Sequence, residues 1–265
     1  MSSDAEWLRP ASSGLLAERF LIAPRHGPGV CRCCLNLTDG DGLCWACRHG
    51  EQRLAVAVPI SYSVGGEGLH RLIVAYKREA DSSVPHALTD LAALCERFLA
   101  LHESCIASAA GLSDGFDRIT TVPSADPLRD LQHPLRRIVG ERCEITRGRY
   151  ERLLVRSESV AIPRVYDPAR YTPTRALTGE SVLLVDDMWT SGASAQSAAG
   201  ALLAAGASSV AAVVLARHLN RSWHNNDARL RDLEQLAFSY ESCVLCARTG
   251  ARIEPGHWLQ SQTLA

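Results

Sequence analysis

The stretch Val182–Ser194 carries the clearest chemistry in this chain, because carboxylates and hydroxyls stand close together in it. Asp186 and Asp187 end an apolar run, and a short turn follows them. The turn supplies hydroxyl groups, a glycine and backbone N–H groups from Thr190, Ser191, Gly192, Ala193 and Ser194. Hydroxyls and free N–H groups at the positive end of a helix suit a phosphate, and a glycine lets the backbone approach it closely. The pattern predicts a phosphate-binding cradle beside an acidic pair.

A strand, a loop and a helix must position these residues. Val182–Val185 lacks polar alternation, which is typical of a strand buried on both faces of a parallel sheet. The carboxyl end of such a strand is the edge of an α/β sheet where ligands commonly bind. A helix is predicted from Ser194 to Ala205, ending at Gly206, and a strand over Val210–Arg217 completes a βαβ unit. Two solvated carboxylates at a strand end are the plainer alternative, whereas a nucleotide P-loop is excluded because no Gly-Lys-Ser/Thr follows a glycine-rich turn.

Two cysteine pairs near the start have the spacing of metal ligands. Cys31 with Cys34 and Cys44 with Cys47 each enclose two residues, and nine residues separate the pairs. Four thiolates complete a tetrahedral shell without an open position, so the sequence predicts a structural zinc site. Cys33 is expected to point away from it. Buried or redox-active thiols are the alternative.

A third pair, Cys243 and Cys246, lies near the end of the chain, with His257 eleven residues further on. Two ligands are only half of a metal site. The tail therefore either binds metal with His257 and another donor, docks near the first cysteines, or packs without metal. Cys95 and Cys105 are expected in the apolar core.

Composition bounds the class of protein. A chain of 265 residues is long enough for one α/β domain with a small appendage, and we divide it into residues 1–52, 53–240 and 241–265. A formal net charge of -1 gives no overall attraction to nucleic acid or an anionic membrane. No apolar run reaches the about 18 residues of a membrane span, and the start lacks a signal-peptide pattern. A cytoplasmic location is expected, where ten cysteines favour metal over disulfides.

Basic residues suggest two further features. Lys77 is the only lysine, which reflects either a general preference for arginine or a site that needs a compact ammonium. Residues 128–156 hold eight arginines against four acidic residues. They form either a salt-bridged surface or a basic rim for a polyanion, with Arg129, Arg136 and Arg137 nearest the strand end. His133 is expected to be a capping or surface residue rather than a catalytic one.

Periodicity and turn residues place the other elements. Strands are predicted over 54–64, with Pro59 marking an edge or a break, and over 117–124 and 153–156. Helices are predicted over 13–22, 69–77 and 89–102, and from about Asp227. The proline-containing stretch 157–179 is expected to be an irregular, mobile lid.

Val182–Ser194 resembles the phosphoribosyl-pyrophosphate (PRPP) signature of type I phosphoribosyltransferases. Together with the first cysteine pairs, Tyr76-Lys77, Val122-Pro123 and Val210–Arg217, the order of motifs is similar to that of the ComF family over residues 31–222. The resemblance implies an α/β fold with a parallel-sheet, Rossmann-like phosphoribosyltransferase domain and a small N-terminal zinc module with four cysteine ligands.

The resemblance also implies roles for individual residues. Asp186 and Asp187 would be the catalytic pair and would accept hydrogen bonds from the ribose hydroxyls, directly or through Mg²⁺. Thr190–Ser194 would bind the 5-phosphate, with Ser124 and Lys77 completing the PRPP site. A nitrogenous base or other amine would then displace pyrophosphate from C1 of PRPP.

An accessory role is the alternative. After Val122-Pro123, ComF proteins usually carry an Arg-Gly-Phe-Asn-Gln-like run, whereas this chain has Leu131–Arg137. A protein of this kind would bind PRPP or a nucleotide without turnover and work in DNA uptake. Only this alternative involves nucleic acid as a partner, and neither interpretation involves a membrane.

Overall fold

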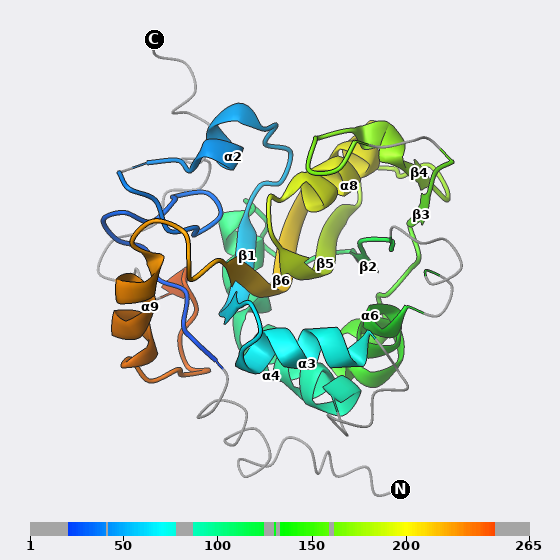
Figure 1. Ribbon diagram of the computed structural model, residues 1–265. Helices are drawn as coiled ribbons and strands as arrows, with labels where there is room; N and C mark the ends of the chain where they lie inside the picture. Colours follow the sequence, from blue (N-terminus) through cyan, green and yellow to red (C-terminus); the bar gives the residue numbers. More distant parts are fainter. Residues whose placement is uncertain are drawn as a thin grey trace, which may run out of the picture.

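Four parallel strands form the central sheet of this protein. The computed structural model describes residues 21–40, 42–77, 87–124, 130, 133–158 and 162–246. Within them the strand order is β1-β6-β5-β2 (Figure 1). The strands are β1 (Ala57–Val64), β2 (Arg118–Thr121), β5 (Ser181–Trp189) and β6 (Ser209–Leu219). The predicted α/β class with a parallel sheet is therefore confirmed.

Helices cover both faces of this sheet. Figure 1 shows α8 on one side and α3, α4 and α6 on the other. The helices are α2 (Trp45–His49), α3 (Gly68–Tyr76), α4 (Ala87–Ala109), α6 (Pro134–Arg137), α7 (Glu144–Arg147), α8 (Ala193–Ala204) and α9 (Asn226–Glu234). A π-helical turn, η2 (Ile138–Arg142), and a 3-10 turn, η3 (Pro168–Arg170), complete the set described.

Strand β5 is buried on both faces, as its unbroken apolar run predicts. Leu183 and Val185 pack into the core that holds α3 and α4. Val182 and Leu184 pack into a second core, formed with α8 and the first two cysteine pairs. Alternate residues of one strand thus hold the two layers of helices against the sheet.

Two parts of the chain differ from the sequence-based predictions. The strand at β3 (Leu154–Arg156) is not in the main sheet but pairs antiparallel with β4 (Tyr171–Pro173). The prediction of an irregular stretch is wrong for residues 168–173, which form η3 and β4, whereas the expected role of this stretch as a mobile lid stays a prediction. Arg175 holds this stretch in place through ion pairs of 2.6 Å with Glu151 and 2.8 Å with Glu180.

The remaining elements agree in position with the predictions. Pro59 lies in β1, which is an edge strand of the main sheet. Helix α4 runs on to Ala109, beyond the predicted end at His102. The predicted helix 13–22 lies outside the described residues except for Leu21 and Ile22, and Ile22 forms a β-bridge with Tyr62.

Gly206, just after α8, gives a test of this packing. Its φ is +107°, and a Cβ would lie 2.2 Å from the carbonyl oxygen of Leu177. The Leu177 backbone cannot retreat easily, because its N–H donates to the Ala205 carbonyl at 2.7 Å. We expect Gly206→Ala to lower the free energy of unfolding by about 3 kcal/mol, the upper end for a strained backbone position. Urea unfolding measures it. Gly40→Ala, with nothing within 4 Å, is the control, and an equal loss in both variants would contradict this packing.

Candidate functional site

A cavity of about 420 Å³ opens at the carboxyl ends of β2 and β5. Parallel sheets commonly bind ligands at this edge. The cavity brings together all nine residues that the sequence assigns to the ligand site, namely Lys77, Ser124, Asp186, Asp187, Thr190, Ser191, Gly192, Ala193 and Ser194. His133, Arg164 and Trp189 also line it. The residues come from segments far apart in the chain, and the ends of the strands hold them in one place.

The acidic pair lies inside β5 rather than after it, because the strand continues to Trp189. The carboxylate of Asp187 is paired: Lys77 Nζ lies 2.7 Å from its Oδ2, and the Tyr76 hydroxyl donates to the same oxygen at 2.5 Å. The Asp187 side chain is only 9% exposed. The only lysine of the chain is therefore the counter-ion of this carboxylate, and the need for a compact ammonium at this position stays a prediction.

Asp186 lies in a different environment from its neighbour Asp187. Its Oδ1 accepts a hydrogen bond from the Asp187 N–H at 2.9 Å. Burial, followed by the negative charge of Asp187, raises the pKa of Asp186 to about 8, and the nearby Lys77 opposes this rise. At neutral pH Asp186 is thus mostly protonated in the ligand-free protein.

The turn after β5 has the geometry of an anion cradle. Gly192 has a φ of +85°, and a Cβ there would lie 2.2 Å from the Trp189 ring. This glycine begins α8, a helix of twelve residues whose first turn holds no acidic residue. Ser191 Oγ accepts a hydrogen bond from the Ala193 N–H at 3.3 Å. The first N–H groups of a helix have no partner within it, so α8 offers donors and a positive dipole end to the cavity.

The loop after β2 forms the opposite wall. The Ser124 N–H donates to Oδ1 of the buried Asp130 at 2.8 Å, and Arg152 donates to its Oδ2 at 2.5 Å. His133 caps α6, because its Nδ1 accepts from the Leu135 N–H at 3.3 Å. The capping role expected for His133 is confirmed, although its ring also faces the cavity.

Residues 162–170 bring an arginine to the cavity that the sequence did not single out. Arg170 is buried and donates to the carbonyl groups of Ile162 at 2.8 Å and Val165 at 2.9 Å. The same guanidinium lies 3.4 Å from Ser194 Oγ of the cradle. Arg164 is thereby held at the cavity wall with its side chain exposed. In the sequence, the only signal for Arg164 was an arginine within a proline-containing stretch.

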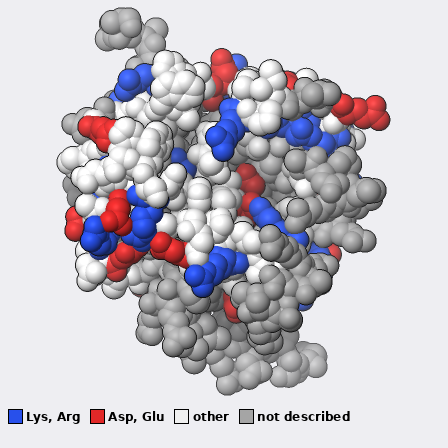
Figure 2. Space-filling model, in the orientation of Figure 1, with Lys and Arg blue, Asp and Glu red and all other residues white. Residues whose placement is uncertain are grey.

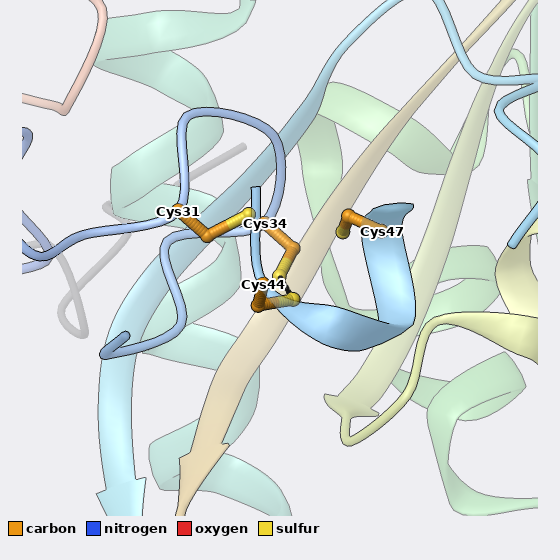
Figure 3. A group of neighbouring side chains, drawn as sticks. All are labelled: Cys31, Cys34, Cys44 and Cys47. Carbon is orange, nitrogen blue, oxygen red and sulfur yellow. Dashed lines mark hydrogen bonds between the residues drawn. The ribbon is translucent and has the colours of Figure 1, made fainter. Parts of the chain in front are cut away.

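Cys31, Cys34, Cys44 and Cys47 form one cluster, as predicted. Figure 3 shows their sulfurs turned toward one another, two from a loop and two from the start of α2. All four sulfurs lie within 4.8 Å of each other and all four residues are buried. The Cys34 and Cys44 sulfurs are 3.6 Å apart, near the about 3.8 Å of a tetrahedral zinc site with 2.3 Å bonds. The cluster can hold a metal ion. Cys33 is not one of these four and donates to Gln52 Oε1 at 2.9 Å, but its side chain also contacts Cys47, so the expectation that it points away is not confirmed.

The cysteine cluster is tied to the cradle through buried polar contacts. Arg217 at the end of β6 donates to the Cys34 carbonyl at 3.0 Å and to the Trp189 carbonyl at 2.9 Å. Gln196 of α8 accepts from the N–H groups of Arg53 at 2.6 Å and Leu54 at 3.1 Å. The loop that follows β5 and the helix that begins the cradle are thus both fastened to the cysteine segment.

The tail cysteines do not dock near the first cluster, so that alternative is wrong. Cys243 and Cys246 lie instead beside His102 and Cys105 of α4. Cys105 was expected in the core and is only partly buried, whereas Cys95 is fully buried as expected. His257 and the tail after residue 246 lie outside the described residues. None of the ten cysteines is in a disulfide.

Three of the seven described arginines in the arginine-rich segment are paired with acidic residues. Arg147, Arg149 and Arg152 pair with acidic residues at 3.7, 2.5 and 2.5 Å. Arg136 donates to the Asp130 carbonyl at 3.0 Å, and Arg129 lies outside the described residues. Figure 2 shows acidic and basic side chains interspersed over the described part of the face in view. These contacts favour the salt-bridged surface over a basic rim.

Similarity to known proteins adds no constraint on this site. No protein-family model matches the chain, and no match is found among the curated proteins. The resemblance to the ComF family therefore stays a prediction, as does the division into three segments. Within the described residues, no helix has both the length and the apolar character needed to cross a membrane.

Proposed function

We propose that the cavity binds PRPP with Mg²⁺ and that the protein is a phosphoribosyltransferase acting on a nitrogenous base or other amine. The main support for this proposal is that the acidic pair and the anion cradle at the start of α8 line the same cavity of about 420 Å³. A sugar phosphate needs both, because its hydroxyls require acceptors and its phosphate requires donors. The fold would then be of the type I phosphoribosyltransferase kind, with the cysteine cluster as a structural zinc site.

Each part of the cavity has a role in this proposal. Thr190–Ser194 donate to the 5-phosphate, and Asp186 and Asp187 accept from the ribose hydroxyls. Carboxylate oxygens are also the donors that Mg²⁺ prefers, and the ion would neutralise charge on the pyrophosphate. Lys77 holds Asp187 in position through their 2.7 Å contact.

The reaction would be a substitution at C1 of the ribose. The acceptor nitrogen forms a bond to C1 while the C1–oxygen bond breaks, pyrophosphate leaves with the bonding electrons, and the nitrogen releases its proton to water. Positive charge develops on the sugar ring in such a transition state, so ionised carboxylates beside the ribose would stabilise it. The chain contributes mainly positioning and charge.

The raised pKa of Asp186 predicts that binding releases a proton. Ligand-free Asp186 has a pKa of about 8, raised by burial and by Asp187, and the bound carboxylate must be ionised to coordinate Mg²⁺. Affinity for Mg–PRPP should therefore rise with pH up to about 8 and then level off. Titration calorimetry at pH 7 in two buffers of different ionisation enthalpy should detect close to one proton released. Asp186→Asn should abolish this proton release, and the same release in that variant would refute the assignment.

The raised pKa of Asp186 also determines whether the folded state becomes more or less stable as pH rises. Folded Asp186 keeps its proton to about pH 8, far above its ordinary pKa of 3.8. The folded protein thus binds more protons than the unfolded chain between these values, and this group's contribution to stability falls as pH rises through that window.

The catalytic proposal is tested by pyrophosphate release. Purified protein is incubated with Mg–PRPP and a panel of nucleobases and simple amines, and pyrophosphate is measured by coupled hydrolysis to phosphate. Release that depends on one acceptor and is lost in Asp187→Asn supports the transferase. Intact PRPP binding without release over the whole panel contradicts it.

The accessory role keeps one specific observation in its favour. No arginine from the described part of residues 128–156 lines the cavity, although pyrophosphate handling commonly uses guanidinium groups. In this second proposal the protein binds PRPP or a nucleotide and acts in DNA uptake. If residues 128–156 form a DNA-binding surface, the affinity for DNA should fall steeply as the salt concentration rises. Charge reversal at Arg142 and Arg147 that left DNA affinity unchanged would exclude that surface.

A further inference from the structure

A second group of metal-binding side chains lies on α4 and the tail, apart from the first cluster. His102 and Cys105 come from α4, and Cys243 and Cys246 come from the segment after α9. Their ligand atoms all lie within 4.8 Å of one another. We propose that these four residues bind a second zinc ion, which fastens the C-terminal segment to α4.

The separations between the ligand atoms fit one tetrahedral ion. The sulfurs of Cys243 and Cys246 are 3.5 Å apart. His102 Nδ1 lies 3.7 Å from Cys246 Sγ and 3.9 Å from Cys105 Sγ. A tetrahedron with Zn–S bonds of 2.3 Å and Zn–N bonds of 2.0–2.1 Å has edges of about 3.8 Å between sulfurs and about 3.6 Å between sulfur and nitrogen. A disulfide would instead need about 2.05 Å between the sulfurs.

The imidazole of His102 is oriented for coordination. His102 is 3% exposed, and its Nε2 lies 2.6 Å from the Tyr240 carbonyl oxygen. A carbonyl only accepts, so Nε2 carries the proton and Nδ1 keeps its lone pair toward the three sulfurs. Metal-binding histidines are commonly held in this way by a backbone carbonyl on the second ring nitrogen.

The tail pair also shows a hydrogen bond that suits a thiolate. The Cys243 N–H donates to Cys246 Sγ at 3.0 Å. A donor aimed at sulfur stabilises its negative charge. Cys243 is buried together with Val244 and Leu245, which pack into the core with α4.

Local geometry explains how two distant segments supply the ligands. His102 and Cys105 are three residues apart on α4, so they point from the same helical face. Cys243 and Cys246 enclose a turn with the same two-residue spacer as the first cluster. Three sulfurs and one nitrogen close the shell, which indicates a structural site rather than a catalytic one.

Metal counting tests the proposal on the whole chain. Native mass spectrometry, with elemental analysis of the same sample, should find two zinc ions per chain. Cys246→Ser should retain one ion, and so should Cys44→Ser, whereas Cys33→Ser should retain both. One ion in the parent protein and none in Cys44→Ser would overturn the second site. A disulfide between Cys243 and Cys246 in the purified protein would overturn it equally.

A substitution that preserves coordination separates binding from folding. In His102→Cys the site becomes four thiolates, so two metal ions per chain should remain. After replacement of zinc by cobalt, the thiolate-to-cobalt absorption should increase relative to the parent, because one more sulfur binds. If the parent takes up one cobalt and its spectrum is unchanged in His102→Cys, the histidine is not a ligand and the proposal fails.

Discussion

Replacing Asp187 by Asn is expected to weaken the binding of Mg–PRPP about 100-fold, which corresponds to about 3 kcal/mol. Asp187 is 9% exposed and lies 2.7 Å from Lys77. The variant removes an acceptor for the ribose and a carboxylate for Mg²⁺, and it leaves the ammonium of Lys77 without its counter-charge. Titration calorimetry on the parent protein and the variant measures the loss.

The control for Asp187→Asn is Glu141→Gln, which removes an exposed carboxylate on η2. Its affinity should equal that of the parent. If the cavity recognised its ligand only as an anion, Asp187→Asn would tighten binding, because the variant removes a negative charge from the cavity. Tighter or unchanged binding of Mg–PRPP by Asp187→Asn would therefore contradict the sugar-phosphate assignment.

Replacing Cys44 by Ser is expected to have the largest effect on stability. Cys44 is one of four buried sulfurs that lie within 4.8 Å of each other. Structural zinc contributes its binding free energy to folding, on the order of 10 kcal/mol in small zinc modules. Even half of that would lower the melting temperature by about 10–20 °C at this chain length. Calorimetric melting, with zinc content measured on the same sample, gives the result.

The loss should extend to the ligand cavity. Arg217 joins the Cys34 carbonyl to the Trp189 carbonyl at 3.0 and 2.9 Å, so a disordered cysteine segment loosens the end of β5. We expect Cys44→Ser to bind Mg–PRPP more weakly than the parent at a temperature where both are folded. Cys33→Ser, whose sulfur faces Gln52, should resemble the parent in both measurements. Equal melting temperatures and zinc contents in Cys33→Ser and Cys44→Ser would contradict a zinc site.

Local patterns in the sequence predicted the strand, the helix and the first cysteine cluster around the candidate site. The unbroken apolar run Val182–Val185 indicated a strand buried on both faces, and the helix after it begins within one residue of the predicted start. Two-residue spacers predicted the first cysteine cluster. These features depend on neighbours in the chain, so periodicity and spacing are enough to find them.

Contacts between distant segments could not be predicted in the same way. Tyr76 meets Asp187 across 111 positions, and His102 meets Cys246 across 144. Arg164 reaches the cavity only because Arg170 holds its segment against α8. No local period encodes such pairs, since they depend on how the layers of the sheet pack. The same cause explains why residues 162–179 looked irregular in the sequence.

One titration tests the central claim most directly. Purified protein, with its metal content determined, is titrated with PRPP in the presence of Mg²⁺, and separately with ribose 5-phosphate and with pyrophosphate. We predict one PRPP bound per chain, weaker binding of ribose 5-phosphate because it lacks the pyrophosphate, and loss of PRPP affinity when Mg²⁺ is chelated by excess EDTA after zinc retention has been verified. A folded, zinc-containing protein that binds neither PRPP nor ribose 5-phosphate would contradict the assignment of this cavity.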